Sequence, residues 1–352
     1  MCLDTESEEV AKSLNSVPSI HVLGLHRLVH NDTNPLFENA SLSADVAAQE
    51  LGGCAAAMRS LLLSYLQNVL GGDSLGAEYL LMYLVSHVLA RTDVLTTGKF
   101  ALNLIIPDSS KDLSFDHIQK LVSDIVTRAA SVKVRIDSLN SMSLIPLRDP
   151  STNRLKSSRL QLPDHTLVLL DETELSAGQL NERGVKNFQA LQELAGKQTV
   201  SYDFVYHSME LPVNLPVLVV SRGGKSMVPC DSHVFLQPSH PPTNSVEDVS
   251  VMNKMRMAMS LLQSESNPEF EVPAEVNSRI EEYFVQLRKI ETIRAKEAAA
   301  SGPNSVEVLH LLLTVGRLLC RTVMSNSLDV DHFQHAVFLE QSRLERIPMK
   351  KQ

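Results

Sequence analysis

Hydrophobic residues recur along this chain with two different periods. Over residues 43–70 and 74–90 they recur at steps of three and four, which predicts two helices separated by a Gly-Gly pair. Apolar runs with the length of buried strands follow at 100–106, 132–136, 167–170, 216–220 and 233–236. Helical stretches at 115–130 and 186–195 lie between them, and 199–211 alternates as a hairpin does. This alternation indicates an α/β fold with a mostly parallel sheet flanked by helices.

A proline-rich segment then divides the chain. Three prolines fall within residues 238–247, a composition typical of a linker. Every apolar pattern after this segment is helical, at 248–264, 273–291, 304–324 and 329–346. We therefore predict a flexible acidic segment over 1–18, an α/β body over 19–238, a linker over 239–248 and an all-helical, lid-like module over 249–352.

Composition limits the classes of partner. The 352 residues are 43% hydrophobic and 21% charged, as in a globular protein. The formal net charge of −9 offers no basic footprint, so we expect no direct nucleic-acid partner. We expect no membrane partner, because no apolar run approaches the roughly 18 residues that suggest a membrane span. The acidic start does not resemble a signal peptide. Four scattered cysteines without a CxxC pair disfavour a zinc ribbon or a disulfide framework.

The sharpest local signal is the pair Asp171 and Glu172, which follows the apolar run 167–170. The Walker B strand of an ATPase ends in this way, with Asp holding Mg²⁺ and Glu polarising the attacking water. For an isolated match, a strand that runs into an acidic turn is the commoner interpretation.

A Walker B strand needs a phosphate-binding loop, and the full GxxxxGK[ST] pattern is absent. The nearest candidate is Gly72-Asp-Ser-Leu-Gly-Ala-Glu-Tyr79. It has Gly72 and Asp73, but Glu78 and Tyr79 stand where phosphate chemistry needs a lysine and a small hydroxyl. The carboxylate would repel phosphate and the phenol ring would crowd the metal. The GxSxG pattern around Ser74 follows a predicted helix, whereas a nucleophile elbow needs a strand before it.

Other candidate chemistry is weaker. The pairs His26/His30 and His332/His335 could each share a helix face, but neither has an obvious third metal ligand. The methionine-rich stretch 252–259 is more typical of core packing than of an adaptable binding surface. We expect no catalytic residue, no cofactor and no metal ion.

Several strings, in order, resemble a known family. They are Gly72-Asp-Ser-Leu-Gly-Ala-Glu-Tyr-Leu-Leu81, Arg91-Thr-Asp-Val-Leu95, Gly98-Lys-Phe100, Leu160-Gln-Leu-Pro163, Asp171-Glu-Thr173, Tyr202-Asp-Phe204 and Leu236-Gln-Pro238. Over about residues 17–345 the chain resembles the minichromosome maintenance (MCM) complex-binding proteins, and its order of parts resembles the AAA+ ATPase domain of the MCM helicase subunits.

The resemblance implies a degenerate AAA+-like body. Against the helicase phosphate loop, Gly72 and Asp73 agree, whereas Glu78 and Tyr79 replace the lysine and the serine. Phe204 stands about where a DNA-contacting lysine lies in the helicases, and Glu307 replaces a sensor arginine. Phosphoryl transfer depends on positioning and on charge stabilisation. We therefore expect remnants of an ATP site, without turnover, at Gly72, Asp73, Glu78, Tyr79, Asp171 and Glu172.

The resemblance also implies a function. It implies a non-catalytic nuclear protein that binds MCM helicase subunits. It further implies that the protein regulates their assembly on or removal from chromatin during DNA replication in S phase, with a role in sister-chromatid cohesion. The alternative is a divergent AAA+ ATPase acting on MCM or another replication complex, which keeps Asp171 and Glu172 and supplies a cation from elsewhere in the chain.

Overall fold

The computed structural model describes residues 55–92, 96–110, 112–243, 248–263, 270–296 and 304–347. The segment 1–18, the start of the first predicted helix, Cys2, Cys54 and the His26/His30 pair lie outside the described residues.

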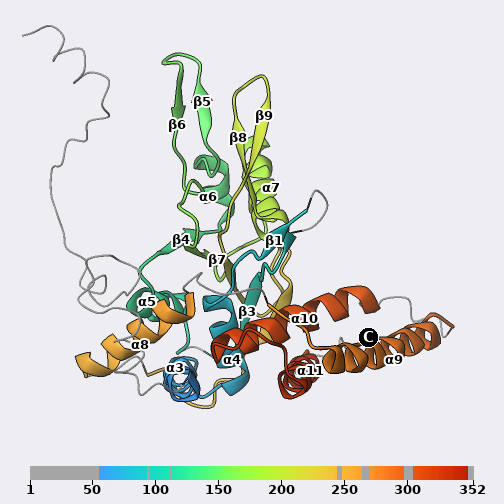
Figure 1. Ribbon diagram of the computed structural model, residues 1–352. Coiled ribbons are helices and arrows are strands. Elements are labelled where there is room, and N and C mark those ends of the chain that lie inside the picture. The colour runs from blue at the N-terminus through green and yellow to red at the C-terminus, as the bar shows by residue number, and fades with distance from the viewer. Residues whose placement is uncertain are drawn as a thin grey trace, which may run out of the picture.

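The centre of the molecule is a five-stranded parallel sheet (Figure 1). Its spatial order is β11 (Ser232–Phe235), β3 (Leu102–Ile106), β10 (Val217–Arg222), β7 (Leu167–Asp171) and β4 (Ala129–Lys133). All five residues of β3 and of β7 are buried, which explains their continuous apolar sequence, since a strand covered on both faces has no polar side. The predicted α/β fold with a helix-flanked parallel sheet is confirmed.

Successive residues of the strands supply two different cores. In β7, Leu167 and Leu169 belong to a cluster with the helices α3 (Ala55–Val69), α4 (Ser74–Leu84) and α5 (Phe115–Ile125). Val168 and Leu170 belong to a second cluster, with α6 (Ile136–Ser141) and α7 (Glu182–Lys197). This follows from the two-residue side-chain period of a strand.

A second, four-stranded sheet stands at one end of the molecule (Figure 1). Its order is β6 (Arg154–Lys156), β5 (Leu147–Asp149), β8 (Thr199–Asp203) and β9 (Ser208–Pro212). The hairpin β8–β9 was predicted at 199–211. The sequence predicted neither the hairpin β5–β6, nor α6, nor the two-residue strands β1 (Ala90–Arg91) and β2 (Thr96–Thr97).

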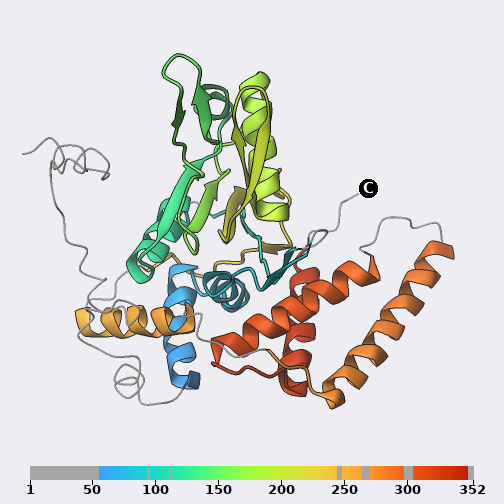
Figure 2. The same ribbon diagram turned by 45° about the horizontal axis from the view of Figure 1, so that its top comes forward.

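The helical module is observed as α8 (Val249–Gln263), α9 (Ala274–Lys296), α10 (Ser305–Thr322) and α11 (Val330–Glu345). Met255, Met257 and Met259 of α8 are buried. The first hydrophobic core continues from α3, α4 and α5 into α8, α10 and α11. The boundary near residue 240 therefore separates types of element along the chain, not separate cores. Figure 2 shows α9 reaching away from the α/β body.

Candidate functional site

The Gly-Asp motif lies in the turn between α3 and α4. Gly71 and Gly72 have φ of +70° and +90°. A Cβ on Gly71 would lie 2.5 Å from the carbonyl oxygen of His240, and one on Gly72 would lie 2.5 Å from Ser239 Oγ. The backbone N–H groups of Ser239 and His240 both donate to the Gly71 carbonyl, at 2.7 and 3.1 Å. The two glycines thus accommodate the chain that leaves β11, and it occupies the space beside their backbone.

Asp73 joins three distant parts of the fold. Its carboxylate caps α4 by accepting the Gly76 N–H at 2.9 Å, and it accepts the Gln237 N–H at 2.7 Å. Arg346, just after α11, places Nη1 2.9 and 2.7 Å from the two carboxylate oxygens. The Asp73 side chain is fully buried. A carboxylate occupied in this way holds structure together and has no orientation left for a ligand.

Tyr79 extends the same contact to α11. Its hydroxyl donates to Glu340 Oε2 at 3.1 Å, and Arg343 donates to both carboxylate oxygens of Glu340, at 2.5 and 2.7 Å. Burial, first of all, and the neighbouring Glu340 carboxylate raise the pKa of Tyr79, so its phenol stays protonated and remains a donor. We call Asp73, Tyr79, Glu340, Arg343 and Arg346 the clasp.

Glu78 has a separate partner. Arg59 of α3 donates to Glu78 Oε2 at 2.5 Å, and its Nε donates to Thr322 Oγ1 of α10 at 2.9 Å. The guanidinium that faces Glu78 therefore belongs to the packing of α3, α4 and α10. Where a phosphate loop would present a lysine, this chain has a half-buried ion pair.

The structure places Asp171 and Glu172 at the carboxyl end of β7. Asp171 Oδ1 accepts the N–H and the hydroxyl of Thr173 at 3.0 and 2.6 Å, which is local turn chemistry. Glu172 is buried, and its Oε2 accepts the Met227 N–H at 3.2 Å. Burial raises the pKa of the Glu172 carboxyl, although hydrogen bonds from Ser226 and Met227 oppose the shift.

These carboxylates and the Gly-Asp motif lie in different places. Asp73 contacts the end of β11, whereas Asp171 and Glu172 end β7, three strand positions across the sheet. At the usual strand spacing this corresponds to roughly 14 Å. A helix, α3, precedes residues 72–79, as the sequence predicts, whereas a phosphate loop joins a strand to a helix.

The segment that does join a strand of the main sheet, β3, to a helix, α5, is 107–114. Arg222, at the end of β10, donates to the carbonyls of Ser110 and Leu113 at 3.0 and 3.3 Å. A Cβ on Gly223 would lie 2.5 Å from Asp108 Oδ2. Sequence reasoning missed this segment; its signal was its position directly after the first buried strand, where ligands of open α/β sheets bind.

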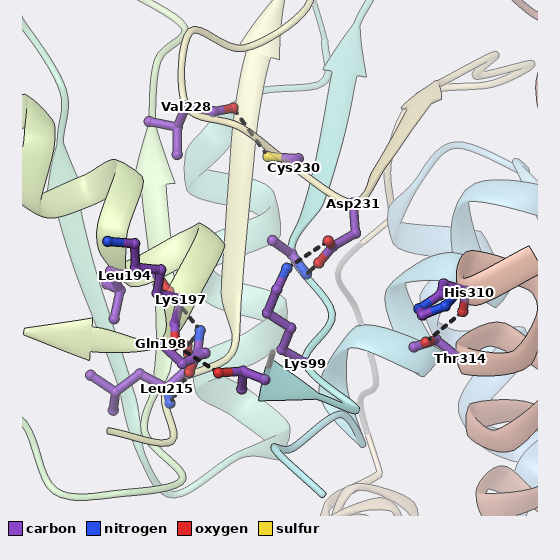
Figure 3. Close-up of polar contacts among 12 residues, drawn as sticks. Lys99, Leu194, Lys197, Gln198, Leu215, Val228, Cys230, Asp231, His310 and Thr314 are labelled. Atoms are coloured by element: carbon purple, nitrogen blue, oxygen red, sulfur yellow. Dashed lines mark hydrogen bonds and ion pairs between the residues drawn. The ribbon is translucent and has the colours of Figure 1, made fainter. Parts of the chain in front are cut away.

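Two further polar contacts lie between neighbouring segments of the main sheet. Ser221 donates to Asn103 Oδ1 at 3.0 Å. Lys99 and Asp231 form an ion pair at 2.6 Å, and Asp231 also accepts the Ala101 N–H at 2.7 Å (Figure 3). Burial raises the pKa of the neighbouring Cys230 thiol, which donates to the Val228 carbonyl at 3.5 Å. The buried thiol is therefore a packing group, not a thiolate nucleophile.

His332 and His335 lie on α11 and line a groove of about 430 Å³ between α3, α10 and α11, together with Arg59. Within the described residues, no three side chains of His, Cys, Asp or Glu are placed to hold a metal ion. Among the described helices, none combines the length and the apolar character needed to cross a membrane.

Comparison with known proteins bears on the whole chain. The family model described as mini-chromosome maintenance replisome factor matches residues 1–347. The chain belongs to this family. The chain is 36% identical over 365 residues to the mini-chromosome maintenance complex-binding protein of Gallus gallus. The aligned region covers 99% of this chain and 55% of that relative.

Similar proteins with the same name occur in distant organisms. The identity is 36% over 348 residues for the Danio rerio protein, covering 95% of this chain and 52% of the relative. It is 30% over 346 residues for the Arabidopsis thaliana protein, covering 97% of this chain and 55% of the relative. The chain thus spans about half the length of the curated relatives it matches. The family membership predicted from the short strings is confirmed.

Proposed function

We propose that this chain binds one or more subunits of the MCM complex and has no catalytic activity. The names of its relatives support the binding partner. The observation that supports the absence of catalysis is the clasp: in the motif whose sequence resembles a phosphate loop, Asp73 and Tyr79 hold Arg346 and Glu340, and the motif follows a helix instead of a strand. Phosphoryl transfer depends on cations positioned to contact the phosphate, and at this motif the described cationic side chains contact carboxylates instead.

The cellular role that we propose rests on the family resemblance. The chain acts in the nucleus during S phase and regulates the assembly of MCM subunits on chromatin or their removal from it, with a role in sister-chromatid cohesion. Binding between neighbouring subunits would compete with closure of their ring. Because the clasp joins the body to α11, we expect the partner to contact a single rigid surface formed by both.

A capture experiment tests the proposal. The chain 1–352 is immobilised and incubated with each purified MCM subunit in turn. We expect at least one subunit to bind, and equally well to the double variant Asp171→Ala/Glu172→Ala. If no subunit binds to the folded chain, the proposed function is wrong. If only the double variant fails while it keeps its thermal stability, the carboxylates at the end of β7 take part.

The second candidate, a divergent ATPase, is favoured by one observation. Glu172 is buried with a raised pKa, and its Oε1 has no hydrogen-bond partner within the described part of the chain. Calorimetric titration with ATP and Mg²⁺, together with a phosphate-release assay, separates the two functions. Micromolar ATP binding that Asp171→Ala abolishes would favour the enzyme, whereas we expect no measurable binding or hydrolysis.

A further inference from the structure

The four-stranded sheet carries an exposed surface that no function above uses. It rises beyond the main sheet, and both of its edge strands, β6 and β9, are exposed along most of their length (Figure 1). Leu155 is 40% exposed and Met209 is 53% exposed. Large apolar side chains at this level of exposure, one on each edge strand of the same small sheet, are typical of surfaces that a partner covers.

The strand registers put these residues on one face. Leu147 pairs with Asp203, so Arg148 lies on the opposite face, together with Leu155, its own partner in β6. By the same alternation Met209, which pairs with Tyr202, shares that face. On the other face, Asp203 contacts Lys186 of α7 at 3.6 Å. The hairpins therefore turn Arg148, Leu155 and Met209 away from α7.

The turn of the β8–β9 hairpin presents an aromatic side chain at its tip. Tyr206 is 93% exposed. Val205 before it has φ of +76°, an uncommon conformation for a β-branched residue. Asp203 Oδ1 accepts the Val205 N–H at 2.8 Å, and the rings of Phe204 and His207 stack at 5.1 Å. These contacts hold the turn that carries Tyr206 in a strained conformation.

The adjacent hairpin is locally basic in an acidic chain. Residues 147–159 contain four cationic side chains and one carboxylate, whereas the whole chain has a net charge of −9. The carboxylate of Asp149 forms an ion pair with Lys156 Nζ at 2.8 Å and accepts hydrogen bonds from the Ser151 N–H and hydroxyl. Arg154 and Arg159 are exposed, and neither makes a hydrogen bond or ion pair with any residue that the structure describes. Positive charge is thus left over on this hairpin.

We propose that this surface, the hairpin face, binds an acidic segment of an MCM subunit that also carries apolar side chains. The hairpin face comprises Arg148, Leu155, Tyr206 and Met209. The exposed Arg154, which pairs with Asp149 and so points to the other face of the edge strand, and the exposed Arg159 stand beside it in the same hairpin segment. Tyrosine and arginine are the residue types that most often dominate protein interfaces. The unpaired guanidiniums match carboxylates, while Leu155 and Met209 need an apolar counterpart. The inference rests on the proposed function.

Nucleic acid is the competing occupant, and the charges disfavour it. Affinity for DNA comes chiefly from many phosphate contacts, and here a few cations stand on a chain that is acidic overall. The exposed Leu155 and Met209 would remain in water against a phosphate backbone, whereas a protein segment would bury them.

The test compares three variants of the full chain with the wild type, using the MCM subunit that the wild type captures. The variants are Tyr206→Ala, Arg154→Glu/Arg159→Glu, and the matched control Arg288→Glu/Lys289→Glu on the exposed part of α9. We expect the first two to bind about tenfold or more weakly, and the control to bind as the wild type does. Raising the salt concentration should weaken wild-type binding more than that of the charge-reversed variant.

The outcomes separate this inference from the proposed function. If the wild type captures no subunit, the proposed function fails and this inference fails with it. If the wild type binds and the folded variants bind equally well, only the hairpin face is wrong. Fluorescence anisotropy with single-stranded DNA is run in parallel. DNA binding that both hairpin variants abolish, with capture of the subunit unchanged, would overturn the inference in favour of nucleic acid.

Discussion

Asp73 and Arg346 are 273 residues apart in the chain, and a single guanidinium nitrogen of Arg346 lies within 2.9 Å of both carboxylate oxygens of Asp73. The carboxylate is fully buried and also caps α4. This pair fastens the end of the helical module to the turn that resembles a phosphate loop. Residues that suggest nucleotide chemistry by their sequence are used here to join two parts of the fold.

Removal of Arg346 should therefore destabilise the whole chain. Arg346→Met leaves a buried carboxylate without its counter-charge, which typically costs about 3 kcal/mol. The free energy of unfolding, measured by urea denaturation, checks this. The matched control is Arg279→Met, which breaks the exposed pair with Glu282 and should cost no more than about 1 kcal/mol. Equal losses in the two variants would contradict the role of the clasp.

Restoration of a helicase-like motif should damage the fold without creating activity. In Glu78→Lys/Tyr79→Ser, a second cation faces Arg59 and a fully buried ring is lost from the core. We expect a loss of about 3–5 kcal/mol, as for other large-to-small core substitutions, and no ATP binding by calorimetry. Glu78→Gln is the milder comparison. Micromolar ATP affinity in the double variant would show that the motif lies in a usable phosphate site.

The turn glycine should tolerate no side chain. Gly71→Ala combines a positive φ with a Cβ placed 2.5 Å from the His240 carbonyl oxygen, and we expect a loss of about 1–3 kcal/mol. The control is Gly196→Ala in α7, where no atom lies within 4 Å of the new Cβ. That change should be neutral or stabilising by up to about 1 kcal/mol. Thermal unfolding of the two variants decides the matter, and a neutral Gly71→Ala would refute the close approach.

Glu172 should make stability depend on pH in a definite direction. Burial raises its pKa, so the folded state binds this proton more tightly than the unfolded state does. Its contribution is fully present below the ordinary glutamate pKa and is lost as the pH rises through the raised value. Glu172→Gln, which stays neutral, should therefore gain stability relative to the wild type between pH 4 and pH 8. Urea unfolding across this range tests it, and parallel pH profiles for the two proteins would show that the carboxyl is not perturbed.

The main sheet and the helical module could be predicted because buried strands and helices have a recognisable local pattern of apolar residues. The run 167–170 is wholly apolar since β7 is covered on both faces, and α10 shows the helical period because one side packs on α4. Boundaries were less well predicted. The helix expected over 74–90 ends at Leu84, where Ser86 bonds back to the Tyr83 carbonyl.

The hairpin β5–β6 has no such pattern of apolar residues. Its residues are largely exposed and polar, so no alternation of apolar positions marks them. Its turn depends on Asn153 at a positive φ, where the side-chain oxygen accepts the Arg148 Nε–H at 3.0 Å. Its place in the sheet depends on the single pairing of Leu147 with Asp203 in a hairpin that lies more than fifty residues later.

The sequence alone determined the α/β class, the helical module, the absence of a complete phosphate loop and the family, because these depend on local patterns and on short strings in order. Only the tertiary structure decided what Gly72, Asp73, Glu78 and Tyr79 do. Their partners, His240, Arg346, Arg59 and Glu340, are spread from one end of the described chain to the other. A side chain's role is set by the groups that the fold brings within a few ångströms of it, and no local pattern specifies those groups.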